Sequence, residues 1–457
     1  MTHPPSVERV LAAARAGAGD RDPGAVLAVA RSVVDEERTR LTAGAAPRDA
    51  VALGAAVVAA LAGFDGTIGP GVPTKVINAT GVVVHTNLGR AAWPRAAIEA
   101  ARRAADGATL LELDRTTGRR GARYREAEAH LVALTGAADA LVLTNNAAAV
   151  ALAVGLAGRG GGVAVSRGEL VEIGGGVRIP EILRRAGVRL VEVGTTNRTR
   201  VADFEAVLAD PRARIQVVLR VHPSNFVQSG FVETPDGAAV AEAAHRHDAI
   251  VVDDLGSGAL LATELVGLAH EPMPRERLAA GADVVTFSGD KLVGGPQAGL
   301  IVGRGDLVAR LRKDPLARAM RPDKTILAAV AATLALYRAG RAMTEIPVWR
   351  MLATPLVTLR ERAASLLAAL PTGEAEVIEL DSTVGGGSVP GQALPSLGVA
   401  IGALNGRRAA ALLALLRTGE PCVIGRIERD RVVLDLRTVT PEDGDALAGA
   451  VTRAIAR

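Results

Sequence analysis

The chain has 457 residues and a net charge of +4, which allows two or three domains and does not by itself indicate a nucleic-acid-binding protein. Hydrophobic residues make up 49% of it, yet no charge-free run of about 20 apolar residues occurs, so no membrane span is expected. No basic segment followed by an apolar core opens the chain, which argues against an export signal. The single cysteine, Cys422, cannot form an internal disulfide, and a reducing cytoplasmic location is expected.

Residues 1–66 have the pattern of a helical N-terminal domain. Val26, Val29, Val33 and Leu41 form an apolar stripe at helical spacing, and residues 48–61 predict another helix. Five glycines and prolines between residues 66 and 73 indicate a linker, which we place at residues 67–80.

From about residue 76, short β-branched segments alternate with Ala-rich helical patterns. The expected strands are residues 140–144, 162–166, 189–193, 215–221, 249–253, 284–288 and 299–302. This alternation predicts βαβ units and a mostly parallel sheet, in a large α/β domain over residues 81–339. Residues 340–457 predict a smaller α+β domain with a Gly-rich loop at 384–390, a helix near 407–417, a hairpin across 422–437 and a last helix from 441.

One lysine stands out because lysine is scarce. Of the 53 basic residues only four are lysine, and Lys291 follows directly on a predicted strand. An amine can deprotonate and attack an aldehyde, whereas a guanidinium stays protonated. Strand ends face the ligand site of open α/β folds, and the hydroxyl of Ser288, three residues earlier, could bind a cofactor phosphate.

Two further strand ends carry polar residues. Asp253 and Asp254 end the strand at 249–253, and a carboxylate there could pair with a protonated pyridine nitrogen; adjacent side chains point to opposite faces, so only one should serve. Asn145, Asn146 and Ala147 follow the strand at 140–144 and open a helix, where backbone amides could bind an anion or the asparagines could simply cap the helix. The chain has neither a P-loop nor a G-x-G-x-x-G turn.

Strand, phosphate turn, acid and lysine occur in the order typical of fold-type I enzymes that use pyridoxal phosphate (PLP). The resemblance becomes specific in seven segments: INATGVVVHTNLGRA at 77–91, SRGE at 166–169 with EIGG at 172–175, HPSNF at 222–226, DLGSG at 254–258, SGDKL at 288–292, PLARAMR at 315–321 and GGGS at 385–388. Together they resemble bacterial L-seryl-tRNA(Sec) selenium transferases over nearly the whole chain, including a helical N-terminal domain.

The resemblance implies a role for each site residue. Lys291 would hold PLP as a Schiff base, and Asp254, favoured over Asp253 by resemblance alone, would face the pyridine nitrogen. The resemblance implies that the arginines matching Arg90, Arg318 and Arg321 hold selenophosphate, and Asp290 would line the same donor site. Spacing adds only that Arg318 and Arg321 share one face of a helical turn.

The resemblance also implies the reaction and the partners. The chain would convert L-seryl-tRNA(Sec) to L-selenocysteinyl-tRNA(Sec) by elimination of water and addition of selenium from selenophosphate. The helical domain would bind the tRNA, and the protein would assemble as a homo-oligomer, a decameric ring of dimers with active sites at the dimer interfaces.

Alternatives remain open. The runner-up is a PLP-dependent lyase or transferase acting on a small amino acid, and a third class is a nucleic-acid-binding protein without catalysis. His222 could approach the cofactor or pack in a loop. His245 and His247 are two residues apart on a predicted helix and point apart, so no metal site is expected.

Overall fold

The computed structural model describes residues 3–63, 74–121, 123–173, 176–371, 373, 375–402 and 406–456. It divides into two compact units, residues 1–75 and 76–457. The Gly- and Pro-rich segment at 66–73 and residues 174 and 175 of the EIGG segment lie outside the described residues. Among the described residues, no helix combines the length and the apolar character needed to cross a lipid bilayer.

The first unit is a bundle of three helices, α1 (Val7–Ala18), α2 (Pro23–Thr42) and α3 (Ala50–Ala62). Each helix begins at a side chain that accepts a hydrogen bond from a backbone amide of the first turn, namely Ser6, Asp22 and Asp49. The three apolar faces meet in one small core, whose fully buried members include Val10, Ala14, Ala30, Val34, Leu53 and Val57.

The second unit is built on a seven-stranded sheet. Its strands, in spatial order, are β2 (Asp139–Leu143), β10 (Gly299–Gly303), β9 (Val284–Ser288), β8 (Ile250–Gly256), β7 (Ile215–Val221), β3 (Gly162–Ser166) and β6 (Arg189–Val193). Strand β10 runs antiparallel to β2 and β9, and the other neighbours are parallel. The mostly parallel sheet and its seven predicted strands are thus confirmed, with ends that differ by up to three residues.

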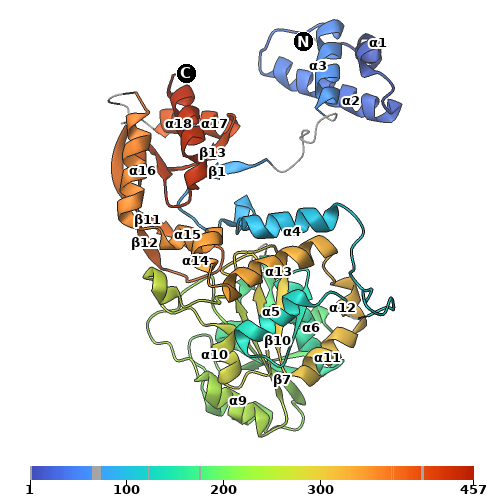
Figure 1. Cartoon of the computed structure of the whole chain (residues 1–457), viewed down its shortest axis with the longest axis vertical. Coiled ribbons are helices and arrows are strands. Elements are labelled where there is room, and N and C mark those ends of the chain that lie inside the picture. The colour runs from blue at the N-terminus through green and yellow to red at the C-terminus, as the bar shows by residue number, and fades with distance from the viewer. Residues whose placement is uncertain are drawn as a thin grey trace. The chain divides into compact units, whose positions relative to one another are not determined.

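Helices cover both faces of this sheet (Figure 1). Along β10, Leu300 and Val302 belong to the core formed with α5 and α13, whereas Ile301 belongs to the core formed with α6 and α11, as the alternation of a strand requires. Helix α13 also packs along α4. The helices of this layered part are α4 (Arg95–Ala105), α5 (Glu126–Thr135), α6 (Asn146–Val154), α7 (Ile179–Arg185), α8 (Val201–Leu208), α9 (Gly237–His245), α10 (Pro274–Ala279), α11 (Gly305–Lys313), α12 (Pro315–Ala319) and α13 (Lys324–Arg338).

Short elements connect these layers. Strands β4 (Glu172–Ile173) and β5 (Val177–Arg178) pair as a small hairpin. The 3-10 turns are η1 (Thr86–Leu88), η2 (Gly155–Ala157), η3 (Arg167–Glu169), η5 (Thr263–Val266) and η6 (Pro441–Asp443).

The C-terminal part is a smaller α+β layer around a four-stranded antiparallel sheet. The sheet has the order β11 (Ala375–Thr383), β12 (Ala393–Ile401), β15 (Arg431–Asp435) and β14 (Arg426–Glu428). Its helices are α14 (Ala342–Glu345), α15 (Pro347–Ala353), α16 (Leu356–Ala368), α17 (Gly406–Thr418) and α18 (Gly444–Ile455).

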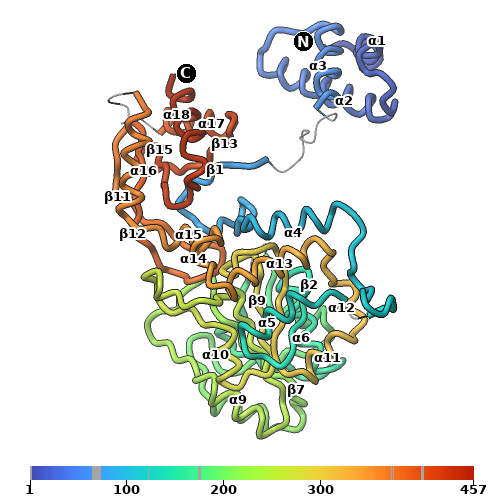
Figure 2. Tube along the Cα trace, viewed as in Figure 1, coloured from blue at the N-terminus to red at the C-terminus, as the bar shows by residue number. Residues whose placement is uncertain are grey.

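Strand β1 (Val76–Asn78) pairs in parallel with β13 (Cys422–Ile424), so the blue start of the second unit lies beside its red end in Figure 2. Residues 76–78, which we assigned to the linker, therefore form a strand of the second unit. A three-residue strand has too little periodicity to be recognised in the sequence when its partner lies near the other end of the chain.

Candidate active site

A cavity of about 230 Å³ opens where the parallel strands β7, β8 and β9 reach their carboxyl ends. Open α/β folds bind ligands at this edge, because the loops that follow the strands diverge there. Eight of the ten predicted site residues line this one cavity: Arg90, Asn145, Asn146, Ala147, Asp254, Ser288, Asp290 and Lys291. These residues come from four separate segments of the chain, one of which carries the predicted lysine.

The amine of Lys291 lies inside the cavity wall. Its Nζ is 3.4 Å from the carbonyl oxygen of Gly387 in the Gly-rich loop. Burial lowers the pKa of Lys291 below its ordinary value, although the negative charge of Asp254 opposes this shift; the positive charge of Arg90 adds to it. A lysine with a lowered pKa is neutral more of the time, which suits it to act as a nucleophile and as a base.

Asp254 faces the same cavity from the end of β8. Its Oδ1 accepts hydrogen bonds from Asn146 Nδ2 at 2.8 Å and from Thr286 Oγ1 at 2.9 Å. Burial raises the pKa of Asp254, and the two hydrogen bonds oppose this shift by stabilising the carboxylate. The preceding Asp253 does not line the cavity, and its Oδ2 is 3.7 Å from Nε of Arg277. The geometry thus places Asp254, of the two adjacent acids, beside Lys291.

The N-terminus of α6 forms another wall of the cavity. Asn145 caps this nine-residue helix, because its side chain accepts a hydrogen bond from the amide of Ala148 at 2.9 Å. The two interpretations of this turn are therefore compatible, since Asn145 caps the helix and also lines the cavity with Asn146 and Ala147. A helix N-terminus at a cavity can bind a phosphate group.

Arg90 reaches the cavity from a strained turn. It has a positive φ of 63°, and its Nη1 donates a hydrogen bond to Asp290 Oδ2 at 2.9 Å. The backbone amide of Ala91 donates to the carbonyl of Asp290 at 3.2 Å, so the turn and the residue before Lys291 are joined twice. A non-glycine residue with positive φ persists where its surroundings hold it in place.

Arg318 and Arg321 do not line the Lys291 cavity of this chain. Arg318 is exposed on the short helix α12. Arg321 lines a different cavity, and its Nη1 is 3.8 Å from Oε1 of Glu112. Within one chain, the predicted donor site is therefore represented only by Arg90 and Asp290.

The structure adds a buried carboxylate that the sequence did not single out. Glu271 is 2% exposed; its Oε2 accepts a hydrogen bond from the amide of Val389 at 3.2 Å, and its Oε1 is 3.4 Å from His222 Nε2. His222 itself lines the cavity, so of its two predicted positions the structure shows the one near the site. Glu271 lies in a loop without any motif, so only the fold reveals its position.

Two aromatic side chains support the segment that follows Lys291. The hydroxyl of Tyr337 lies 3.0 Å from the carbonyl oxygen of Leu292 and 2.9 Å from that of Val293, so its one proton is shared between them, and Trp349 Nε1 donates to Tyr337 Oη at 2.6 Å. Trp349 Nε1 also lies 2.9 Å from the carbonyl of Leu292.

We expect Tyr337→Phe to lower the free energy of unfolding by about 1–3 kcal/mol, because the buried carbonyl of Val293 loses its donor, whereas the carbonyl of Leu292 keeps Trp349 Nε1. Urea denaturation followed by circular dichroism measures this loss. The other tyrosine of the chain, Tyr124, is 39% exposed, and Tyr124→Phe is the matched control. Equal stability of the two variants would contradict the role given to the Tyr337 hydroxyl.

Comparison with known proteins agrees with this geometry. The family model described as SelA, L-seryl-tRNA selenium transferase, matches residues 76–440. An L-seryl-tRNA(Sec) selenium transferase of Carboxydothermus hydrogenoformans is 46% identical over 375 residues, which cover 81% of this chain and 80% of the relative. One of Rhizobium meliloti is 46% identical over 374 residues, 80% of each chain.

Among solved structures, D-glucosaminate-6-phosphate ammonia-lyase superposes with a TM-score of 0.59 at 22% identity, covering 83% of this chain and 95% of that one. This likeness concerns the fold.

The second unit is a fold-type I α/β protein, with a lysine and a buried aspartate at the carboxyl edge of its sheet. The chain belongs to the L-seryl-tRNA selenium transferase family. The family model begins at residue 76, so the helical unit before it lies outside that match.

Proposed function

We propose that this protein converts L-seryl-tRNA(Sec) to L-selenocysteinyl-tRNA(Sec) in the cytoplasm, with PLP as cofactor and selenophosphate as selenium donor. The observation that carries the proposal is the arrangement of Lys291, Asp254 and the N-terminus of α6 around one cavity. Family membership supplies the substrate class.

The cavity suits PLP in its chemistry. The Lys291 amine would react with the aldehyde, the buried carboxylate of Asp254 would pair with the pyridine nitrogen, and the N-terminus of α6 would hold the phosphate. Within the described part of the chain, Asn146 Oδ1 and Asp290 Oδ1 are buried without a hydrogen-bond partner, although both belong to residues that line the cavity. Buried polar atoms of this kind favour a ligand that supplies the missing partners.

Each residue then has a part in the reaction. PLP, when bound, disperses negative charge from the α-carbon of the seryl group. Lys291 holds the cofactor and then removes the α-proton with Nζ, for which its lowered pKa suits it. Asp254 would hold a proton on the pyridine nitrogen, and the α6 N-terminus would hold the phosphate group. Arg90, positioned by Asp290, would bind selenophosphate, whose selenium bonds to the β-carbon after the hydroxyl and the α-proton have left as water. Water then takes up the phosphoryl group, so that the P–Se bond breaks and phosphate is released.

Borohydride reduction and peptide mapping test the assignment of the lysine. We propose that reduction of the PLP-loaded protein attaches the pyridoxyl group to the peptide that contains Lys291. A label on one of the other three lysines, Lys75, Lys313 or Lys324, would contradict the proposal.

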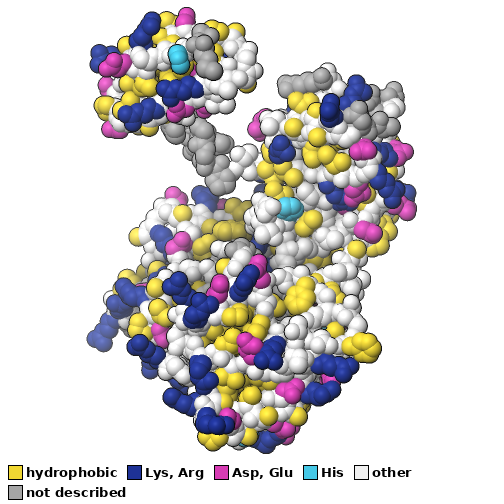
Figure 3. Space-filling view, turned by 180° about the vertical axis from the view of Figure 1, so that it is seen from behind, with side chains coloured by type: hydrophobic (Ala, Val, Ile, Leu, Met, Phe, Trp, Pro, Cys, Tyr) yellow, Lys and Arg dark blue, Asp and Glu magenta, His cyan; other side chains and the backbone are white. Residues whose placement is uncertain are grey.

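We further propose that the helical unit binds the tRNA. On the face drawn in Figure 3, basic side chains occur on several parts of this unit with acidic ones among them, which suits contacts to phosphates spread over a shape rather than one dense patch. A gel shift with serylated tRNA tests tRNA binding by the full chain. Absence of binding at low salt would favour the alternative enzyme that acts on a small amino acid.

The exposed arginines lead to a proposal about assembly. We propose that the protein is a homo-oligomer of dimers, a decamer as in the family it resembles, and that a second copy brings Arg318 and Arg321 to the Lys291 cavity. Their exposure in one chain supports this proposal.

Two inactive variants should then complement each other. We expect Lys291→Ala and Arg321→Ala to be inactive alone, and their co-expression to restore about a quarter of the wild-type activity, because half of random dimers are mixed and each has one intact site. Selenocysteinyl-tRNA formation by the purified mixture measures this. Activity no greater than that of the separate variants would show that Arg321 acts within its own chain or not at all.

A further inference from the structure

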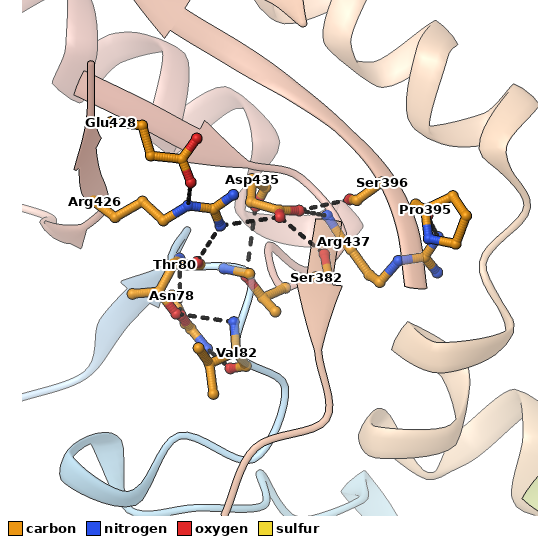
Figure 4. A network of polar contacts seen from close by, with 12 residues as sticks. Asn78, Thr80, Val82, Ser382, Pro395, Ser396, Arg426, Glu428, Asp435 and Arg437 are labelled. Atoms are coloured by element: carbon orange, nitrogen blue, oxygen red, sulfur yellow. Dashed lines mark hydrogen bonds and ion pairs between the residues drawn. The ribbon is translucent and has the colours of Figure 1, made fainter. Parts of the chain in front are cut away.

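A buried carboxylate of the C-terminal layer lies at the centre of a polar network (Figure 4). Asp435 ends β15 and is 0% exposed. Its Oδ1 accepts hydrogen bonds from Ser396 Oγ at 2.7 Å and from the amide of Arg437 at 3.1 Å. Its Oδ2 accepts from Ser382 Oγ at 2.8 Å and from Arg426 Nη1 at 3.2 Å. The amide of Arg437 and the guanidinium of Arg426 can only donate, so each carboxylate oxygen of Asp435 accepts at least one hydrogen bond from a fixed donor.

Contacts of the network with residues 79–81 form a first arm, which continues along the chain to Arg90. Nη1 of Arg426 also donates to the carbonyl of Thr80, and the amide of Asp435 donates to the carbonyl of Ala79 at 2.9 Å. Gly81 follows with a φ of 79°, and a Cβ on it would lie 2.3 Å from both Arg426 Nη1 and Asp435 Oδ2. The turn is thus pressed against the network at the start of the segment that ends at Arg90 in the cavity.

The other arm leads to the loop that faces Lys291. Ser382 is bonded to Asp435 and lies just before the Gly-rich loop at 385–388. A Cβ on Gly385 would lie 2.3 Å from Val82, and one on Gly386 would lie 2.6 Å from Val84. The carbonyl of Gly387 then receives Lys291 Nζ at 3.4 Å.

The two arms are also bonded to each other. The amide of Thr383 donates to the carbonyl of Gly81 at 2.8 Å, and the amide of Val84 donates to the carbonyl of Val384 at 2.8 Å. The segments at 81–84 and 383–384 therefore run side by side from the Asp435 network toward Lys291.

We propose that Asp435 is a positioning residue for the active site, which fixes Arg90 and Gly387 relative to Lys291 through these two arms. This inference rests on the proposed function. Asp435 touches no residue that lines the cavity and therefore acts through Ser382, Arg426 and the turn at Gly81. Loss of its charge should loosen both arms while leaving Asp254 and the α6 N-terminus in place, because these belong to the large sheet.

The charges around Lys291 decide whether loss of the Asp435 charge raises or lowers the pH at which the Lys291 nitrogen is protonated. Asp254 from β8, Asp290 from the end of β9 and Glu271 from the loop after η5 face the amine with negative charge, and Arg90 faces it with positive charge. If Arg90 withdraws, the nitrogen of Lys291 is protonated more easily. The midpoint of the pH-dependent visible absorption of the PLP-loaded protein should then rise.

The test compares full-length wild type, Asp435→Asn, Ser382→Ala and Asp381→Asn. Asp381 is exposed on the same strand as Ser382 and provides the matched control. For Asp435→Asn and Ser382→Ala we expect kcat per folded protein to fall roughly 10- to 100-fold, with KM for seryl-tRNA within about twofold. The midpoint pH should rise by about half a unit or more. Asp381→Asn should match the wild type.

The outcomes are distinguishable. Thermal unfolding corrects each rate for the folded fraction, and if Asp435→Asn does not fold, Ser382→Ala decides by the same measurements. A normal visible band with kcat per folded protein and midpoint pH equal to those of Asp381→Asn would overturn the positioning role alone. A wild-type protein without the visible band, after PLP is supplied, would overturn the proposed function itself and this inference with it.

Discussion

Replacement of Lys291 by alanine should lower the rate of selenocysteinyl-tRNA formation by at least about 10³-fold, because both the bond to PLP and the base at the α-carbon are lost. The protein should remain folded, since the Lys291 amine makes one long hydrogen bond, to Gly387 at 3.4 Å, and its removal relieves the cost of a buried charge. The visible absorption of the PLP-loaded protein should disappear with the activity.

Two control variants show whether activity depends on the reactive amine of Lys291 or only on a positive charge. Lys291→Arg keeps a cation at the position and should be as inactive as alanine, because a guanidinium does not deprotonate. Lys313→Ala removes an exposed lysine from the end of α11 and should leave activity unchanged. Substantial activity in Lys291→Ala, or loss of the visible band in Lys313→Ala, would contradict the assignment.

Lys291 and the pair Asp253 and Asp254 could be found from the sequence because they lie in or just after strands with strong signals. Strand β8 opens with the apolar run Ile250–Val252 before its two aspartates, β9 is apolar except for Thr286 before it ends at Ser288, and both are buried on each face of the sheet. Parallel strands end at one edge, so polar residues at their ends must gather there. Strand alternation places Asp253 and Asp254 on opposite faces of the sheet but does not say which one faces the cavity, so a geometric choice between them needed the structure.

Other parts of the site had no local signal. Glu271 lies in a loop, and Asp435 ends an ordinary antiparallel strand, so nothing in their neighbours indicates a link to Lys291. Their roles depend on pairings between distant segments, such as β1 with β13 and Val84 with Val384. Arg318 and Arg321 show a further limit, because the motif that predicts them as ligands does not place them in the Lys291 cavity within one chain.

Asp254→Asn should lower kcat roughly 10²- to 10⁴-fold while the fold and the bond between Lys291 and PLP persist. An asparagine can turn its amide oxygen toward Asn146 Nδ2 and Thr286 Oγ1 and so keep both hydrogen bonds of the carboxylate. Only the negative charge is lost, and burial already raises the pKa of Asp254, so the neutral side chain costs no stability. Asp253→Asn, on the opposite face, is the matched control, and an equal loss of kcat there would contradict the assignment.

Asp254→Asn also tests the direction in which the midpoint pH of the visible absorption moves. Because the charge of Asp254 raises the pKa of Lys291, its removal should lower the midpoint pH of the visible absorption. Asp435→Asn is expected to raise that midpoint, since it loosens the opposing charge of Arg90. Two Asp→Asn variants of one chain should thus move one spectroscopic midpoint in opposite directions, and a general loosening of the fold would move both the same way. A titration of both PLP-loaded variants therefore distinguishes a charge that acts at the cofactor from one that acts through the backbone.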